Sequence, residues 1–242
     1  FQARHFPATP TQSHFPPFMK ILLALSVALA CWASISCSPS PRGAGGSARY
    51  AAFDLPASRP VNPANVEVKV SIRNQAAYVM EGNRPLLVMP VAVGTQSKPT
   101  PLGKFRIFKK DHKHRANSHG YASKDGRITQ TWLAKKPAGW NFKGTPMPYW
   151  CEFKAHYGFH TGWMKPYPCT HGCLRMHENL APKFYHLVQV GTPVTIATTL
   201  PEDLTIGRKI PRPPDAGPLP DYPYSFYLGE GYFTKHKTPL YR

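Results

Sequence analysis

The peptide YGFHTGWMKPYPCTHGCLRM occupies residues 157–176, and the rest of the chain is arranged around it. It contains two histidines, His160 and His171, and two cysteines, Cys169 and Cys173. Glycines and prolines lie between them, so we predict a shaped loop rather than a helix or a long strand. A thiol needs a nearby base or cation to become a thiolate, so cysteine and histidine together indicate nucleophilic catalysis.

Short strands are predicted before and after this peptide. Val66 to Ile72 alternates apolar and polar residues, which is typical of a half-buried strand. Further strands are expected at residues 76–80, 86–93, 104–109 and 192–197. Apolar residues at helical spacing predict one helix over 177–190, with Pro182 tolerated near its start. The pattern predicts a mainly β, antiparallel domain over residues 66–199 with one or two short helices.

The residues around Cys173 carry a family resemblance. Thr170-His171-Gly172-Cys173 resembles the Ser/Thr-His-Gly-Cys motif of the L,D-transpeptidase catalytic domain (YkuD-type, ErfK-like). The resemblance extends over roughly Val66 to Thr198. The other matching segments are Val91–Gly94, Thr100–Phe105, Met147–Trp150 and Gly158–His160.

The resemblance implies a β-sandwich-like domain in which Cys173 is the nucleophile and His160 the base. A backbone carbonyl near Thr161 would orient the imidazole. We expect a thiolate–imidazolium pair at rest, because such pairing lowers the pKa of a cysteine. The N–H groups of Gly172 and Cys173 are candidate oxyanion donors.

Other residues near the motif have two interpretations each. His171 either holds the turn, as Thr170 does, through hydrogen bonds or takes a direct part in catalysis. Arg175 either binds a substrate carboxylate or braces the loop against a carbonyl. Tyr149 and Trp150 either wall a substrate groove or belong to the core.

The implied reaction is peptidoglycan cross-linking. A tetrapeptide stem would form a thioester with Cys173 and release D-Ala, and an amine would resolve the thioester. Alternatives are an L,D-carboxypeptidase, an enzyme that anchors proteins to peptidoglycan, and a wall-binding module without catalysis. A metal-binding protein using His160, His171, Cys169 and Cys173 is a further alternative, although the family implies no metal or organic cofactor.

The chain is strongly basic, with 30 Lys and Arg against 12 Asp and Glu among 242 residues and a formal net charge of +18. This balance favours an anionic partner such as an acidic wall polymer, or simply gives a basic protein without a charge-driven partner. Nucleic acid is disfavoured by the export signal described next. We expect a monomer whose partners are peptidoglycan stem peptides.

The first 37 residues resemble a targeting region. Residues 1–18 are predicted to be a non-native or disordered leader, with Met19 as the start. Residues 19–37 have the charged start and short apolar run of a signal peptide. Cys37 is a candidate lipidation site that would tether the protein to a membrane, and simple cleavage would release it. We therefore expect a periplasmic or cell-envelope protein.

Three segments are predicted to be irregular. Residues 38–65 are predicted to be a flexible linker because they are rich in Ser, Pro, Gly and Ala. Asp111 to Asn141 is predicted to be a basic loop, in the family a lid, in which His112, His114 and His119 are exposed rather than metal ligands. Residues 200–242 are predicted to be a Pro/Tyr-rich extension that wraps the domain or stays extended, with no partner.

The chain has five cysteines, three of them in the predicted domain. An odd number in an exported domain indicates one free reactive thiol, for which Cys173 is the candidate. Cys151 and Cys169 then either form a disulfide or remain free, and the sequence leaves both possibilities open.

Overall fold

A computed structural model describes residues 46–215 and 223–234 of the chain. All of these residues belong to one unit. The predicted leader, signal peptide and lipidation site at Cys37 lie outside the described residues. No helix within 46–215 and 223–234 is long and apolar enough to cross a membrane.

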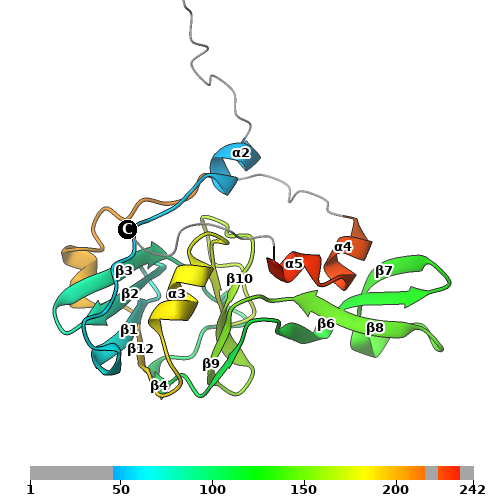
Figure 1. Cartoon of the computed structure of the whole chain (residues 1–242), viewed down its shortest axis with the longest axis horizontal. Helices are drawn as coiled ribbons and strands as arrows, with labels where there is room; N and C mark the ends of the chain where they lie inside the picture. Colours follow the sequence, from blue (N-terminus) through cyan, green and yellow to red (C-terminus); the bar gives the residue numbers. More distant parts are fainter. Residues whose placement is uncertain (1–45, 216–222, 235–242) are drawn as a thin grey trace, which may run out of the picture. The chain divides into compact units, whose positions relative to one another are not determined.

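The first of three sheets has five strands in the order β3-β2-β1-β12-β4, and Figure 1 shows it at one end of the described region. The strands are β1 (Val66–Ser71), β2 (Ala76–Glu81), β3 (Arg84–Pro90), β4 (Gly103–Arg106) and β12 (Pro193–Ala197). The apolar residues of β1 are buried, as their alternation predicts. β1 pairs in parallel with β12, whereas the other pairs are antiparallel.

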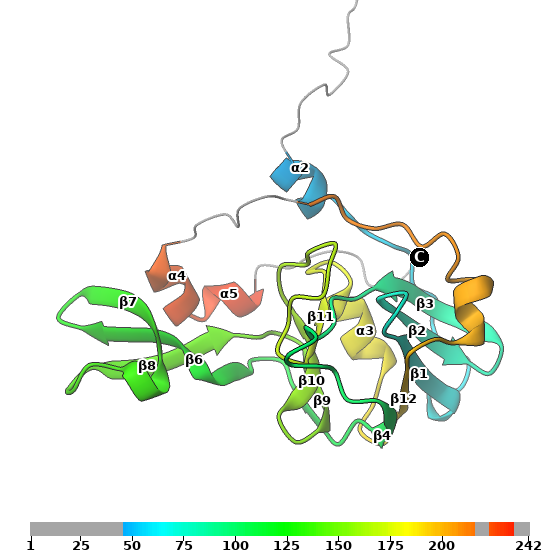
Figure 2. The ribbon, with the colours of Figure 1, turned by 180° about the vertical axis from the view of Figure 1, so that it is seen from behind.

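The second sheet carries the peptide that contains the His and Cys residues. Its strands are β5 (Lys109–Asp111), β9 (Trp150–Lys154), β10 (Tyr157–Thr161) and β11 (Leu174–Met176), in the order β11-β10-β9-β5. Figure 2 shows β9, β10 and β11 next to one another. β10 and β11 are parallel, so the polypeptide between them must cross over, and that connection is the loop of residues 162–173.

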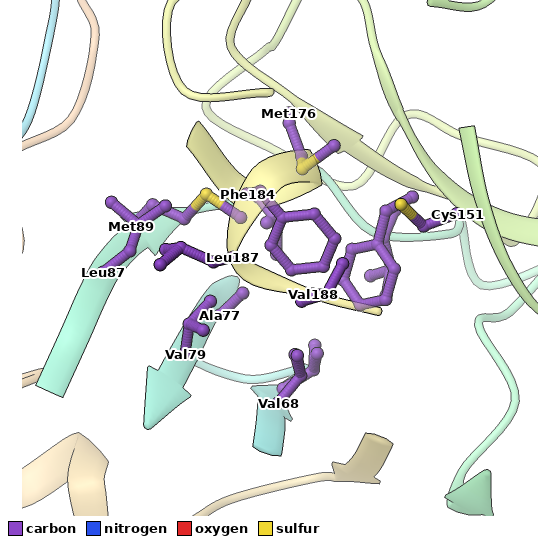
Figure 3. Packing of buried hydrophobic residues seen from close by; sticks show 14 of the residues in the cluster. Val68, Ala77, Val79, Leu87, Met89, Cys151, Met176, Phe184, Leu187 and Val188 are labelled. Atoms are coloured by element: carbon purple, nitrogen blue, oxygen red, sulfur yellow. The ribbon is translucent and has the colours of Figure 1, made fainter. Parts of the chain in front are cut away.

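Helix α3 (Ala181–Leu187) lies among the apolar side chains of these two sheets. In Figure 3, Phe184 and Leu187 lie among side chains of the first sheet, such as Met89, and of the second, such as Cys151. Phe184 is fully buried, which the helical spacing of the sequence predicts. The mainly β fold with few short helices is therefore confirmed.

The third sheet corrects the prediction of a loop over residues 111–141. It has the order β7-β6-β8 and consists of β6 (Arg115–Lys124), β7 (Arg127–Trp132) and β8 (Asn141–Pro146), with the 3-10 helix η2 (Leu133–Lys135) between β7 and β8. Asp125 and Gly126 join β6 to β7, both with positive φ. An Asp-Gly pair is the strongest short-range hairpin signal, because a type I′ turn needs positive φ at both positions. The sheet has few apolar residues, which hid its alternation.

The N-terminal residues that we predicted as linker are partly packed. Helix α2 (Gly46–Ala51) brings in Tyr50, which is 1% exposed. Asp54 forms an ion pair with Lys183 of α3, with both carboxylate oxygens 2.7 Å from Nζ. Leu55 joins the core, and the 3-10 helix η1 (Pro63–Asn65) leads into β1. We call residues 50–55 the N-terminal strap.

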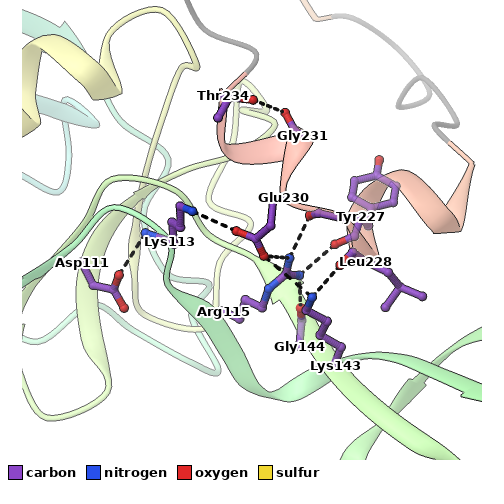
Figure 4. Close-up of polar contacts among 11 residues, drawn as sticks. Asp111, Lys113, Arg115, Lys143, Gly144, Tyr227, Leu228, Glu230, Gly231 and Thr234 are labelled. Carbon is purple, nitrogen blue, oxygen red and sulfur yellow. Dashed lines mark hydrogen bonds and ion pairs between the residues drawn. The ribbon is translucent and has the colours of Figure 1, made fainter.

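The C-terminal extension also packs onto the domain. The 3-10 helix η3 (Pro201–Leu204) places Asp203 against the Tyr78 hydroxyl at 2.6 Å. Helix α4 (Tyr224–Leu228) lies on strands β7 and β8 of the third sheet, and helix α5 (Gly231–Thr234) contacts α4. Figure 4 shows Arg115 and Lys143 of that sheet donating hydrogen bonds to carbonyl groups of residues 227–229. We call residues 224–234 the C-terminal strap.

Candidate active site

One face of the second sheet carries the candidate catalytic residues. Side chains alternate between the two faces of a strand. Cys151, Phe159 and Leu174 point into the core, so the residues between them face the other way. The residues on this opposite face, which we call the site face, are Trp150, Glu152, Gly158, His160, Cys173 and Arg175.

The turn before Cys173 is held by the Thr170 hydroxyl. It donates to the Cys173 carbonyl at 2.6 Å and accepts the Gly172 N–H at 3.2 Å. Gly172 has φ +107°, and a Cβ there would lie 2.5 Å from the Tyr157 ring, so no other residue fits without a shift. The Gly172 N–H is thus already engaged. The Cys173 N–H makes no backbone hydrogen bond within the described residues, and it remains a candidate oxyanion donor.

The Cys173 thiol is surrounded by the backbone of the β9–β10 hairpin. Its Sγ lies 3.7 Å from the His156 carbonyl oxygen, to which the S–H donates. Burial raises the pKa of the Cys173 thiol, and the Gly158 N–H and the Arg175 guanidinium offset only part of this effect. The Glu152 carboxylate raises this pKa further.

His160 is buried and held by one hydrogen bond. Its side chain is 6% exposed, and Nδ1 lies 2.8 Å from the Thr161 carbonyl oxygen. A carbonyl only accepts, so Nδ1 carries the proton and Nε2 has a free lone pair. Burial lowers the pKa of His160 to about 3, and the nearby Arg175 charge acts in the same direction.

The structure does not favour the thiolate–imidazolium pair that we expected. Within the described residues, no hydrogen bond joins the Cys173 Sγ to the His160 ring. Burial raises the thiol pKa and lowers the imidazole pKa, and both shifts favour the neutral forms. The prediction considered the pairing of two charges and omitted the cost of removing both from water.

Arg175 braces the loop in this structure. Its Nη1 donates to the Trp163 carbonyl at 2.9 Å and lies 3.8 Å from the Cys169 Sγ. Its aliphatic part packs on Gly162, where a Cβ would lie 2.7 Å from the Arg175 Cδ. The bracing interpretation therefore describes the observed contacts.

The two aromatic residues of the Met-Pro-Tyr-Trp segment differ. Tyr149 has φ +60° and belongs to the core, where its ring meets those of His112 and Tyr185. Trp150 lies on the site face, with its ring centroid 4.3 Å from His114 and 6.1 Å from His160. Because the indole occupies the space over Gly158, a side chain there would clash.

Several expectations about histidines and cysteines need correction. His171 is exposed and stacks on Trp132 of β7 at 6.3 Å, whereas the Thr170 hydroxyl makes the hydrogen bonds of the turn. His112, His114 and His119 are only partly exposed, because each packs against an aromatic ring.

The three cysteines of the domain are free thiols. The Cys151–Cys169 disulfide is not formed, because Cys151 is fully buried in the core and Cys169 lies beside Arg175. No group of three His, Cys, Asp or Glu side chains in the described part of the chain is arranged to hold a metal ion.

Two residues near the site were not predicted to contribute. The Tyr50 hydroxyl accepts the Met164 N–H at 2.9 Å, and its ring stacks on Trp163 at 4.5 Å. The Ser/Pro/Gly-rich composition around Tyr50 predicted a linker and hid this role. An isolated aromatic residue in such a segment does, however, indicate a possible packing contact. Glu152 of β9 lies on the site face across from Gly158, and it belongs to none of the motifs of the sequence.

The fold and the site define a mainly β domain with a histidine and a cysteine on one face of a sheet. More particularly, residues 65–196 match the family model described as the L,D-transpeptidase catalytic domain (YkuD). This match spans more than half of the chain, which therefore belongs to that family.

Several solved structures are similar to this chain. An L,D-transpeptidase (Yku) from Stackebrandtia nassauensis has 20% identity, with 80% of this chain and 99% of that chain covered and a TM-score of 0.43. An L,D-transpeptidase from Mycobacterium smegmatis has 19% identity, 55% and 58% coverage and a TM-score of 0.42. One from Mycobacterium tuberculosis has 19% identity, 55% and 57% coverage and a TM-score of 0.42. The match thus spans little more than half of each mycobacterial protein, and no curated protein matches this chain.

Proposed function

We propose that this chain is a peptidoglycan L,D-transpeptidase in which Cys173 is the nucleophile and His160 the base. One observation carries the proposal. Cys173 and His160 lie on the same face of neighbouring parts of one sheet, and the Thr161 carbonyl holds His160 in the tautomer that leaves Nε2 free to accept a proton. Membership of the family agrees with this assignment.

Acylation begins when Nε2 of His160 removes the thiol proton. A rotation about the Cα–Cβ bond of Cys173 moves the S–H from the His156 carbonyl toward the imidazole. The sulfur attacks the carbonyl carbon of the third residue of a tetrapeptide stem, and the proton passes from His160 to the departing amine of D-Ala. A C–S bond forms and a C–N bond breaks, which leaves a thioester.

Deacylation transfers the acyl group to an amine. The nitrogen attacks the thioester carbonyl, the C–S bond breaks, and the sulfur leaves with a proton returned through His160. The Cys173 N–H stabilises the oxyanion in both steps. Arg175 acts as a positioning residue, because it fixes the Trp163 carbonyl and hence the loop next to His160.

We also propose that the protein is exported to the cell envelope and works there as a monomer on peptidoglycan stems. The family's wall substrate and the apolar run after Met19 support export. Cys37 is the proposed lipid attachment point. The net charge of +18 suits a wall polymer that bears carboxylates.

The test is to incubate the full chain with a disaccharide-tetrapeptide and to follow protein and products by mass spectrometry. We expect a thioester adduct on Cys173, loss of D-Ala and a cross-linked dimer, all absent in Cys173→Ala. Tripeptide without dimer would identify an L,D-carboxypeptidase. A persistent thioester without product would indicate that the true acceptor is missing from the mixture. Absence of adduct and product in the reduced wild type would favour a wall-binding module.

A further inference from the structure

Glu152 lies close to the candidate nucleophile on the site face. The register pairs Glu152 of β9 with Gly158 of β10. On the other side of β10, Phe159 pairs with Leu174 of β11, and this places Cys173 beside Gly158. Residues directly opposite in a sheet share a face, so the Glu152 and Cys173 side chains flank Gly158. The carboxylate is near enough to act on the thiol, whose pKa it raises.

The Glu152 carboxylate is fixed in place but retains free acceptor capacity. Its Oε1 accepts the His156 N–H at 2.9 Å, and its Oε2 accepts the Trp150 Nε1–H at 3.2 Å. An ionised carboxylate has about four acceptor positions, so about two remain for another donor. The two existing hydrogen bonds orient the group without neutralising it.

No cation of the described chain neutralises Glu152. Most carboxylates here have an ion-pair partner, as Asp54 has Lys183 and Glu81 has Arg84. Glu152 forms no ion pair within residues 46–215 and 223–234, although Lys109 lies across from it on β5. Asp203 is also partly buried without an ion pair among the described residues, but it accepts hydrogen bonds from four groups, whereas Glu152 accepts only two. The less satisfied Glu152 carboxylate therefore favours a cation from outside.

We infer that Glu152 binds the positively charged amine of the acyl acceptor beside the thioester on Cys173. This inference rests on the proposed function. The acceptor arrives as an ammonium ion, donates to the free positions of the carboxylate and loses one proton to solvent. The neutral nitrogen then attacks the thioester carbonyl, so a C–N bond forms, the C–S bond breaks, and the second proton leaves with the sulfur.

The test compares two nucleophiles on Glu152→Gln. In the first reaction a disaccharide-tetrapeptide is the donor, and the side-chain amine of a second molecule is the acceptor. In the parallel reaction the same donor is used with hydroxylamine, which is uncharged at neutral pH and traps the acyl group as a hydroxamate. We expect the dimer-to-thioester ratio to fall by about tenfold or more, because a charge-assisted hydrogen bond is lost. The hydroxamate-to-thioester ratio should change much less. Asp125→Asn, which removes a carboxylate from the β6–β7 turn, is the matched control and should keep both ratios.

The outcomes that would contradict the inference can be told apart from one another and from a failure of the proposed function. If dimer and hydroxamate fall together, Glu152 acts only through the His156 turn, and the inference is overturned. If the dimer-to-thioester ratio stays at the wild-type value, the carboxylate does not bind the acceptor. If wild-type protein forms no thioester, the proposed function fails first, and the inference fails with it.

Discussion

The N-terminal strap and the C-terminal strap both pack onto the domain from outside residues 65–196, but they do so by different chemistry. The N-terminal strap uses buried groups: the Lys183 side chain is 3% exposed and Tyr50 is 1% exposed. The C-terminal strap also buries Tyr232 and Phe233, but its ion pairs are exposed, because the Glu230 side chain is 59% exposed where it meets Lys113, Arg115 and Lys143. Burial decides how much an ionic contact stabilises, so the two attachments should differ in strength and in sensitivity to salt.

The largest effect is expected from Asp54→Ala. This change leaves the Lys183 ammonium buried, and within the described part of the chain its one remaining close partner is the Leu55 carbonyl at 2.6 Å. Loss of one member of a buried pair lowers the free energy of unfolding by about 3 kcal/mol or more. Urea denaturation would measure it. The double variant Asp54→Ala/Lys183→Met should recover most of the loss, and equal losses in both variants would contradict the ion-pair explanation.

Tyr50→Phe should have a smaller effect that reaches the active site. The ring and its stacking on Trp163 remain, but the buried Met164 N–H loses its acceptor. We expect a loss of about 1–2 kcal/mol in the free energy of unfolding. Because Trp163 also receives the Arg175 hydrogen bond, we expect a lower thioester formation rate as well. An unchanged rate would mean that the strap stabilises the fold without positioning the loop.

Glu230→Gln should have a small effect on global stability, since exposed ion pairs contribute little. The change removes the charge that faces three cations of the third sheet, while the carbonyl contacts of Arg115 and Lys143 remain. We expect faster hydrogen exchange in residues 224–234, with the difference from wild type vanishing in high salt. A difference that persists in high salt would contradict an electrostatic attachment.

The smallest expected effect is a pH dependence of how stably the C-terminal strap is attached to the domain. Hydrogen bonding and the charge of Lys113 hold the pKa of Glu230 below its usual value. A carboxylate whose pKa is lowered on folding stabilises above its unfolded pKa, and this contribution is lost as the pH falls through the folded value. The protection of residues 224–234 against hydrogen exchange, measured relative to the intrinsic exchange rate at each pH, should therefore fall below about pH 4. Glu230→Gln is the control and should lack this step.

The sequence predicted the parts of the fold that depend on local patterns. Alternation identified β1, apolar spacing identified α3, and the motif around Cys173 identified the family. The third sheet was missed because its strands contain few apolar residues and these do not alternate regularly with polar ones, although Asp125-Gly126 indicated the hairpin. The N-terminal strap was missed because a single buried Tyr50 in a linker-like composition has no periodicity.

The sequence indicated which residues lie at the candidate site, but it did not indicate their protonation states or the groups that surround them. The neutral state of His160 depends on burial beside Trp150 and on the Arg175 charge, and these come from different strands. The position of the Cys173 thiol depends on the His156 carbonyl, which has no sequence signal. Glu152 becomes informative only when the register of β9 and β10 places it across from Gly158.

The Asp54–Lys183 ion pair has a consequence for where the catalytic domain begins. The family match alone would define the catalytic domain as residues 65–196. A fragment cut there keeps Lys183 and discards Asp54, Tyr50 and Leu55, so it retains a buried cation and an uncovered patch of core. The folding unit of this chain is therefore larger than its homologous segment, and expression of the domain should begin no later than residue 46.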